Sequence, residues 1–203
     1  MSVATKKRVD EQVFNVPNQL TALRLLLSIV LFVLLAFQYY WPSVVVFLIA
    51  ASTDWVDGYW ARKYGQITTL GRILDPFVDK IIICGTFIFL AAVPGSGVRP
   101  WMAVVIVGRE LFVTALRNFL EGEGADFSAS LSGKLKMVLQ CTAAVVSMYA
   151  LTFEVAAAVP PSRPDSLIWL LDISVWSAVA LTIYSGLDYI RRAVSLLRRY
   201  GTS

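Results

Sequence analysis

The chain has 203 residues, of which 57% are hydrophobic and 16% charged, with a formal net charge of +4. A soluble domain of this length would carry about 25% charged residues, so the composition excludes an ordinary soluble protein and favours a membrane-embedded one. The two cysteines, Cys84 and Cys141, lie far apart in apolar runs. This spacing predicts buried thiols rather than a disulfide or a metal site.

Six apolar stretches follow one another along the chain, each near the ~20 residues that a helix needs to cross the hydrocarbon core. They cover about residues 20–40, 43–60, 76–94, 100–120, 135–159 and 167–190. Only helices or closed barrels satisfy the backbone in lipid, and these runs are too long for barrel strands. We therefore predict an all-α integral membrane protein with six transmembrane helices. Residues 1–203 are expected to form one membrane domain, with a cytoplasmic segment at 1–19 and a basic cytoplasmic tail at 191–203.

The basic residues predict the orientation of these helices, because lysine and arginine accumulate on the cytoplasmic side of a membrane. If both termini are cytoplasmic, 16 of the 18 lysines and arginines lie on that side, and Arg99 and Arg163 are the other two. We therefore predict that both termini are cytoplasmic. The connection between the second and third spans is then cytoplasmic too, and the basic tail is expected to contact anionic lipid headgroups.

That connection carries four aspartates between apolar runs, where an ionised carboxylate costs roughly 2.5–3.5 kcal/mol or more near the bilayer core. Asp54 and Asp57 are three residues apart, and Asp75 and Asp79 are four apart, so each pair shares one face of a helix. The chain contains no histidine, and oxygen-only ligation suits Mg²⁺, Mn²⁺ or Ca²⁺. Two divalent cations would offset the four negative charges, and paired metals are a recurrent device for displacement at phosphorus. The alternative is a solvated cluster in which the aspartates pair with the nearby basic residues Arg62, Lys63, Arg72 and Lys80.

The full pattern is Asp54-x2-Asp57-Gly58-x2-Ala61-Arg62-x8-Gly71-x3-Asp75-x3-Asp79. Its eight fixed positions match the signature of the CDP-alcohol phosphatidyltransferases, and the chain resembles that family. The resemblance implies a six-helix membrane enzyme, usually a dimer, with its active site at the cytoplasmic side. Such enzymes displace CMP from a CDP-linked lipid with an alcohol in the presence of Mg²⁺ or Mn²⁺.

The resemblance also implies a role for each position of the signature. The four aspartates would bind two divalent cations, and Asp79 would in addition take the proton of the acceptor hydroxyl. Gly58, Ala61 and Gly71 would leave room for the CDP group, with Arg62 near its phosphates. The sequence has no Walker-type phosphate loop and no recognisable serine or cysteine nucleophile, which favours direct transfer.

Four cations in the second half of the chain suggest an acceptor that carries a phosphate: Arg109, Arg117, Lys134 and Lys136. We take the first three as candidates for binding that phosphate. They could instead be anchors on the cytoplasmic side, as we expect for Lys136, and Arg109 could pair with Glu110. Charge alone does not separate glycerol 3-phosphate from inositol phosphate.

The run "NVPNQLTALRLLL" at residues 15–27, and "RE…LR" followed by "GKLK", resemble the bacterial branch of the family that uses glycerol 3-phosphate. Thr114, Ala115 and Met137 depart from the residues usual in that branch. The resemblance implies that CDP-diacylglycerol and glycerol 3-phosphate are converted to phosphatidylglycerophosphate and CMP by a homodimer in the bacterial cytoplasmic membrane, without a nucleic-acid partner. Two alternatives are the same scaffold with inositol phosphate, serine or phosphatidylglycerol as acceptor, and, more distantly, a divalent-cation transporter.

Overall fold

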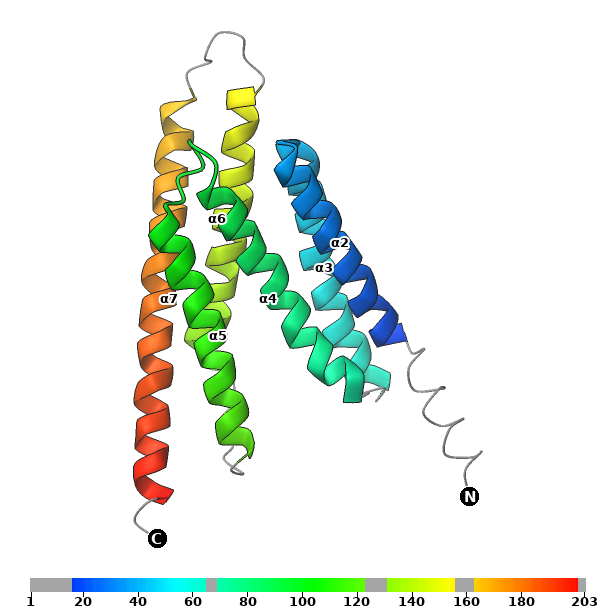
Figure 1. Ribbon diagram of the computed structural model, residues 1–203, viewed down its shortest axis with the longest axis vertical. Helices are drawn as coiled ribbons and strands as arrows, with labels where there is room; N and C mark the ends of the chain where they lie inside the picture. Colours follow the sequence, from blue (N-terminus) through cyan, green and yellow to red (C-terminus); the bar gives the residue numbers. More distant parts are fainter. Residues whose placement is uncertain (1–15, 65–68, 123–130, 156–162, 201–203) are drawn as a thin grey trace. The chain divides into compact units, whose positions relative to one another are not determined.

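The computed structural model of the protein describes the backbone of residues 16–64, 69–122, 131–155 and 163–200, and the side chains of 19–53, 76–120, 133–154 and 163–195. These residues form six helices, with no strand among them (Figure 1). The helices are α2 (Val16–Ala36), α3 (Tyr40–Tyr64), α4 (Thr69–Ala91), α5 (Pro100–Gly122), α6 (Leu131–Val155) and α7 (Asp165–Tyr200). The all-α prediction is confirmed, and each helix overlaps one of the six apolar stretches.

Within the described side chains, three helical stretches are long and apolar enough to cross a membrane: Gln19–Ala36 in α2, Gly133–Glu154 in α6 and Asp165–Ser195 in α7. Large apolar side chains such as Leu26, Phe37 and Val104 are exposed, whereas hydroxyl side chains such as Ser28 and Thr182 are fully buried. This distribution is typical of helices in lipid, where apolar surface is not driven inward and small polar residues sit between helices. The protein is a membrane protein.

The chain divides into two compact units, and the first comprises residues Met1–Gly85. Here α2 packs along α3 (Figure 1). The two helices are joined by a tight turn in which Gln38 has a positive φ of 62°, and Tyr39 N–H donates to the carbonyl of Leu34 at 2.8 Å. This is the Schellman ending of a helix, with glutamine in the position usually taken by glycine. The ring of Phe32 on α2 lies directly against Gly85 of α4, where any Cβ would overlap it.

The second unit comprises residues Thr86–Ser203. Helix α7 packs against both α6 and α5. Between α5 and α7 lies a core of Val113, Leu120, Tyr189 and Ala193. Trp101 of α5 and Trp176 of α7 add a tilted aromatic pair, with ring centroids 5.8 Å apart.

The connection from α4 to α5 is held by Arg163, a residue much further along the chain. Gly95 and Gly97 have positive φ angles of 82° and 75°, which glycine adopts without steric cost. Arg163, just before α7, donates to the carbonyl of Gly95 at 2.7 Å and pairs with Glu154 of α6 at 2.7 Å. One arginine therefore ties two connections and a helix end together.

Two helices extend beyond their predicted spans. Helix α4 begins at Thr69, although the third span was predicted from about residue 76, and it continues through Pro76. Asp75 and Asp79 therefore belong to one helix. Helix α7 has 36 residues, about 54 Å, so the predicted basic tail begins within this helix, which continues to Tyr200.

Candidate active site

The signature residues lie on two helices of the first unit. Asp54, Asp57, Gly58, Ala61 and Arg62 occupy the C-terminal half of α3, and Gly71, Asp75 and Asp79 occupy the N-terminal half of α4. Both halves are helical, so the predicted spacings of three and four residues do put each aspartate pair on one helix face. The side chains of these residues other than Asp79 lie outside the described part of the structure.

The register of the two helices places the aspartate pairs at a similar distance from the connection. Four residues separate Tyr64 from Thr69, which allows at most about 18 Å between the two helix ends. At 1.5 Å per residue, Asp57 lies about 10 Å before the end of α3, and Asp75 lies about 9 Å after the start of α4. Helices α3 and α4 run in opposite directions (Figure 1).

Asp79 is the signature aspartate whose surroundings are described. Arg24 of α2 donates from Nη1 to Oδ1 of Asp79 at 2.9 Å. The side chain of Arg24 is 1% exposed, whereas that of Asp79 is 34% exposed. The carboxylate is thus held through one oxygen by a buried guanidinium and still keeps a substantial exposed surface.

The donor set fits a divalent metal such as Mg²⁺ or Mn²⁺. It consists of the carboxylate oxygens of Asp54 and Asp57, about one turn apart on α3, and of Asp75 and Asp79, about one turn apart on α4. The chain contains no histidine, and the side chain of Asp79 is 34% exposed. Among the side chains that the structure describes, no group of three could hold a metal ion. Three of the four aspartates have side chains outside that set, and the fit to a metal is one of donor chemistry and helical register.

Lys80 was one of the candidate partners for the aspartates in a solvated charge cluster. Its ammonium group donates to the carbonyl of Pro76, one turn back in the same helix, at 2.9 Å. Arg62, Lys63 and Arg72, the other candidates, have side chains outside the described residues.

Arg109 is held between helices of the second unit. Its guanidinium donates to Ser185 of α7 at 2.5 Å and to Glu110 at 3.3 Å, and it lies 5.4 Å from the ring centre of Tyr189. Glu110 in turn binds Lys136 of α6, and both side chains are almost fully buried. The predicted pairing of Arg109 with Glu110 is present, and Lys136 is buried in an ion pair between helices.

The other two acceptor candidates differ in exposure. Lys134, at the start of α6, is exposed, and Arg117, two turns after Arg109 on α5, is half-buried. All three belong to the second unit, whereas the aspartates belong to the first.

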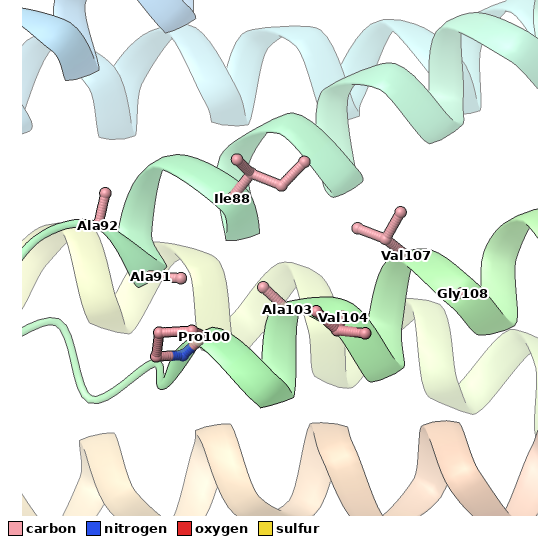
Figure 2. A pocket seen from close by; sticks show the side chains of 8 residues that line it. All are labelled: Ile88, Ala91, Ala92, Pro100, Ala103, Val104, Val107 and Gly108. Carbon is pink, nitrogen blue, oxygen red and sulfur yellow. The ribbon is translucent and has the colours of Figure 1, made fainter.

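A cavity of about 540 Å³ lies between α4 and α5 in the second unit (Figure 2). It is lined by Ile88, Ala91, Ala92, Pro100, Ala103, Val104, Val107 and Gly108. None of these side chains is polar, so this cavity has no group for chemistry at phosphorus.

Two contacts of these networks were missed from the sequence: that of Arg24 with Asp79, and that of Glu110 with Lys136. Arg24 and Glu110 are ionisable residues within apolar helices, a placement that generally indicates a specific partner. That signal was present in the sequence, but it does not encode these two partners.

Comparison with known proteins assigns the class. Residues 14–184 match the family model for CDP-alcohol phosphatidyltransferase. The chain belongs to this family of enzymes, as its aspartate signature predicted.

Bacterial relatives resemble the chain over almost its whole length. Proteins of Bacillus subtilis (strain 168), Pseudomonas fluorescens and Cereibacter sphaeroides are 32%, 33% and 30% identical to it. The matches cover 88%, 92% and 91% of this chain and 95%, 94% and 98% of the relatives. All three relatives are named CDP-diacylglycerol–glycerol-3-phosphate 3-phosphatidyltransferase.

Proposed function

We propose that the protein transfers the phosphatidyl group of CDP-diacylglycerol to glycerol 3-phosphate, forming phosphatidylglycerophosphate and releasing CMP. The observation that carries this proposal is the similarity to three relatives named for that reaction, which extends through both halves of the chain. The signature alone supports the reaction class, whereas the match beyond residue 80 supports the choice of acceptor.

The reaction is a single displacement. A hydroxyl oxygen of glycerol 3-phosphate attacks the phosphorus of the phosphatidyl group, the bond from that phosphorus to the CMP oxygen breaks, and the hydroxyl proton is released. We assign the removal of this proton to Asp79, because a poor nucleophile needs a base and the chain has no histidine. The exposed surface of Asp79 supports its access to a substrate.

Asp54, Asp57, Asp75 and Asp79 are proposed to hold two divalent cations, Mg²⁺ or Mn²⁺. When bound, such cations neutralise charge on the attacking and leaving oxygens of a phosphoryl displacement. The oxygen-only donor set and the helical register of the two pairs support this assignment.

The donor site is proposed to use the small residues of the signature. Gly58, Ala61 and Gly71 would let the CDP group approach the helix backbones closely, and Arg62 would bind its phosphates. Their positions on α3 and α4, in the same helix halves as the aspartates, support this role.

Arg109, Arg117 and Lys134 are proposed to bind the phosphate of the acceptor. Lys134 is exposed, and Arg109 is fixed by Ser185 and Tyr189, so its guanidinium is oriented before a ligand arrives. A preoriented guanidinium loses less conformational freedom when it binds a phosphate.

The setting follows from the charge distribution. We propose six transmembrane helices with both termini and the active site on the cytoplasmic side of the bacterial cytoplasmic membrane. The bias of 16 of 18 basic residues toward that side supports this topology. We further propose that both units form one catalytic domain and that the enzyme is a homodimer.

A parallel assay with different acceptors tests the proposal. The purified protein in mixed micelles is given CDP-diacylglycerol with glycerol 3-phosphate, inositol phosphate, serine or phosphatidylglycerol, and the lipid product is identified by mass spectrometry. We expect phosphatidylglycerophosphate with the first acceptor and only trace products with the others. A larger yield with any other acceptor would overturn the assignment of glycerol 3-phosphate while leaving the class intact.

A further inference from the structure

The contact between Arg24 and Asp79 joins a buried residue to an accessible one. Arg24 lies in the first half of α2, within an apolar helix, and is 1% exposed. Its partner, 55 residues away on α4, is 34% exposed, and Nη1 to Oδ1 is 2.9 Å. Both residues belong to the first unit.

Lacking an oppositely charged partner costs more free energy for a buried guanidinium than for a carboxylate that is partly exposed to solvent. A guanidinium is cationic, so the burial of Arg24 in an apolar helix requires an anionic or carbonyl partner. The side chain of Asp79 keeps 34% of its surface exposed. The position of Arg24 on α2 therefore determines where the Asp79 carboxylate lies.

We propose that Arg24 is a positioning residue for Asp79. It holds Oδ1 and so fixes the orientation in which the carboxylate serves the chemistry. This inference rests on the proposed function, in which Asp79 binds a cation and takes the acceptor proton. Arg24 itself would touch neither substrate. Residues that orient metal-binding carboxylates in this way typically contribute tenfold to hundredfold to metal affinity or activity.

The competing account is that Arg24 only ties α2 to α4. In that account its removal would lower stability, and any loss of function would be independent of Asp79. A double-substitution cycle separates the two, because effects that act through a shared partner do not add. Arg24→Met removes the charge and keeps an unbranched apolar side chain, Arg24→Lys keeps the charge with a single donor group, and Asp79→Asn removes the carboxylate.

The first readout is binding of Mn²⁺ without substrates, measured from the free-ion electron paramagnetic resonance signal in detergent. We expect Arg24→Met to weaken Mn²⁺ binding by about tenfold to hundredfold and Arg24→Lys to recover part of it. In the Asp79→Asn background, adding Arg24→Met should change the affinity by less than about twofold. Equal losses in both backgrounds would overturn the proposal, as would wild-type affinity in Arg24→Met.

A matched control is Lys80→Met, which removes the same charge from the residue next to Asp79. Lys80 donates to the carbonyl of Pro76, so this substitution does not touch the Arg24 contact. We expect it to leave Mn²⁺ affinity within about twofold of wild type. By charge alone, removing a cation beside the site would strengthen Mn²⁺ binding, so a loss as large as that of Arg24→Met would show that the effect is not specific to the Arg24 contact and would overturn the proposal.

The second readout is catalysis. Arg24→Met is expected to lower kcat about tenfold to hundredfold with a smaller change in the KM for the donor.

If Arg24→Met does not fold, Arg24→Lys decides by the same cycle: it must lower the Mn²⁺ affinity of the otherwise wild-type chain and leave that of the Asp79→Asn variant unchanged. Because the Mn²⁺ measurement needs no substrate, it can succeed when no acceptor supports transfer, and that result would reject the proposed function and keep this inference.

Discussion

Gly95 shows how one residue determines the turn between α4 and α5. Its φ of +82° lies in the left-handed region, and a Cβ there would also overlap the carboxylate of Glu154. That carboxylate is the partner of Arg163, which donates to the carbonyl of Gly95. Both the backbone conformation and the adjoining ion pair therefore require a glycine.

We predict that Gly95→Ala lowers the free energy of unfolding by at least about 1–2 kcal/mol, the cost of placing an L-residue in the left-handed region. The thermal midpoint of the purified protein in detergent measures this. Gly108→Ala is the matched control, because a Cβ at Gly108 of α5 meets no atom within 4 Å. Equal midpoints for the two variants would contradict the role given to Gly95.

For individual residues, the sequence predicted candidate chemical roles better than it predicted contacts between side chains. The aspartate spacing pointed to the reaction class, and family membership is confirmed. The contact of Arg24 with Asp79 was not predicted, because 55 residues separate them and no local pattern encodes which helices meet. Lys80 was a candidate partner for the aspartates, and the structure gives it a hydrogen bond to the carbonyl of Pro76 within its own helix.

At the scale of helices, the ion cluster of Glu110, Lys136 and Arg109 links α5, α6 and α7. Glu110 and Lys136 are 8% and 5% exposed, and Arg109 continues the network to Ser185 of α7. A nearby hydrogen bond from Gln140 of α6 to Thr182 of α7, at 3.0 Å, adds a second polar link. Polar contacts of this kind supply orientation where apolar packing between helices has little preference.

We predict that Glu110→Gln destabilises the fold strongly, by about 3–5 kcal/mol, because Lys136 then loses its buried carboxylate partner. The double variant Glu110→Leu, Lys136→Leu should be clearly more stable than Glu110→Gln, since no buried charge of that pair is left. Thermal unfolding in detergent measures both.

The control is Asp188→Asn, which breaks an ion pair with Arg192 one turn away on α7. This pair is partly exposed, so its loss should change stability by no more than about 0.5 kcal/mol. If the double variant at positions 110 and 136 is less stable than Glu110→Gln, the buried pair is not the source of the effect.

The helix boundaries show the limit of hydropathy as a guide. It located all six helices, but the third span was predicted to begin near residue 76, whereas α4 begins at Thr69. Hydropathy reports where a segment becomes apolar enough for lipid, and a polar first turn is still a helix. For the same reason α7 runs ten residues past its predicted end at residue 190, through a basic segment.

For the whole molecule, the distribution of lysine and arginine predicts which side of the membrane each helix end faces. Ser166 and Ser195 are exposed residues near opposite ends of α7, about 44 Å apart along the helix. This separation exceeds the ~30 Å hydrocarbon core, so the two positions lie on opposite sides of the membrane if α7 crosses it. Because Arg163 precedes α7 and four arginines lie in 191–199, the Ser195 end should be cytoplasmic.

We predict that Ser166→Cys reacts with a membrane-impermeant maleimide in intact spheroplasts, and that Ser195→Cys reacts only after permeabilisation. Both substitutions are made in a chain in which Cys84 and Cys141 are replaced by alanine, and that chain without a new cysteine is the background control. The reverse labelling pattern would invert the topology, and labelling of both positions in intact spheroplasts would reject a crossing by α7.

Release of CMP from CDP-diacylglycerol shows whether the protein carries out metal-dependent transfer to glycerol 3-phosphate. The assay compares the purified protein with and without glycerol 3-phosphate, in Mg²⁺ or Mn²⁺ and in excess EDTA, with Asp54→Asn as the variant lacking one proposed ligand. We predict CMP release only when acceptor and metal are both present, in equal amount to the phosphatidylglycerophosphate formed, and a near-complete loss in Asp54→Asn. Release at the same rate without glycerol 3-phosphate, or full turnover in excess EDTA, would contradict the account.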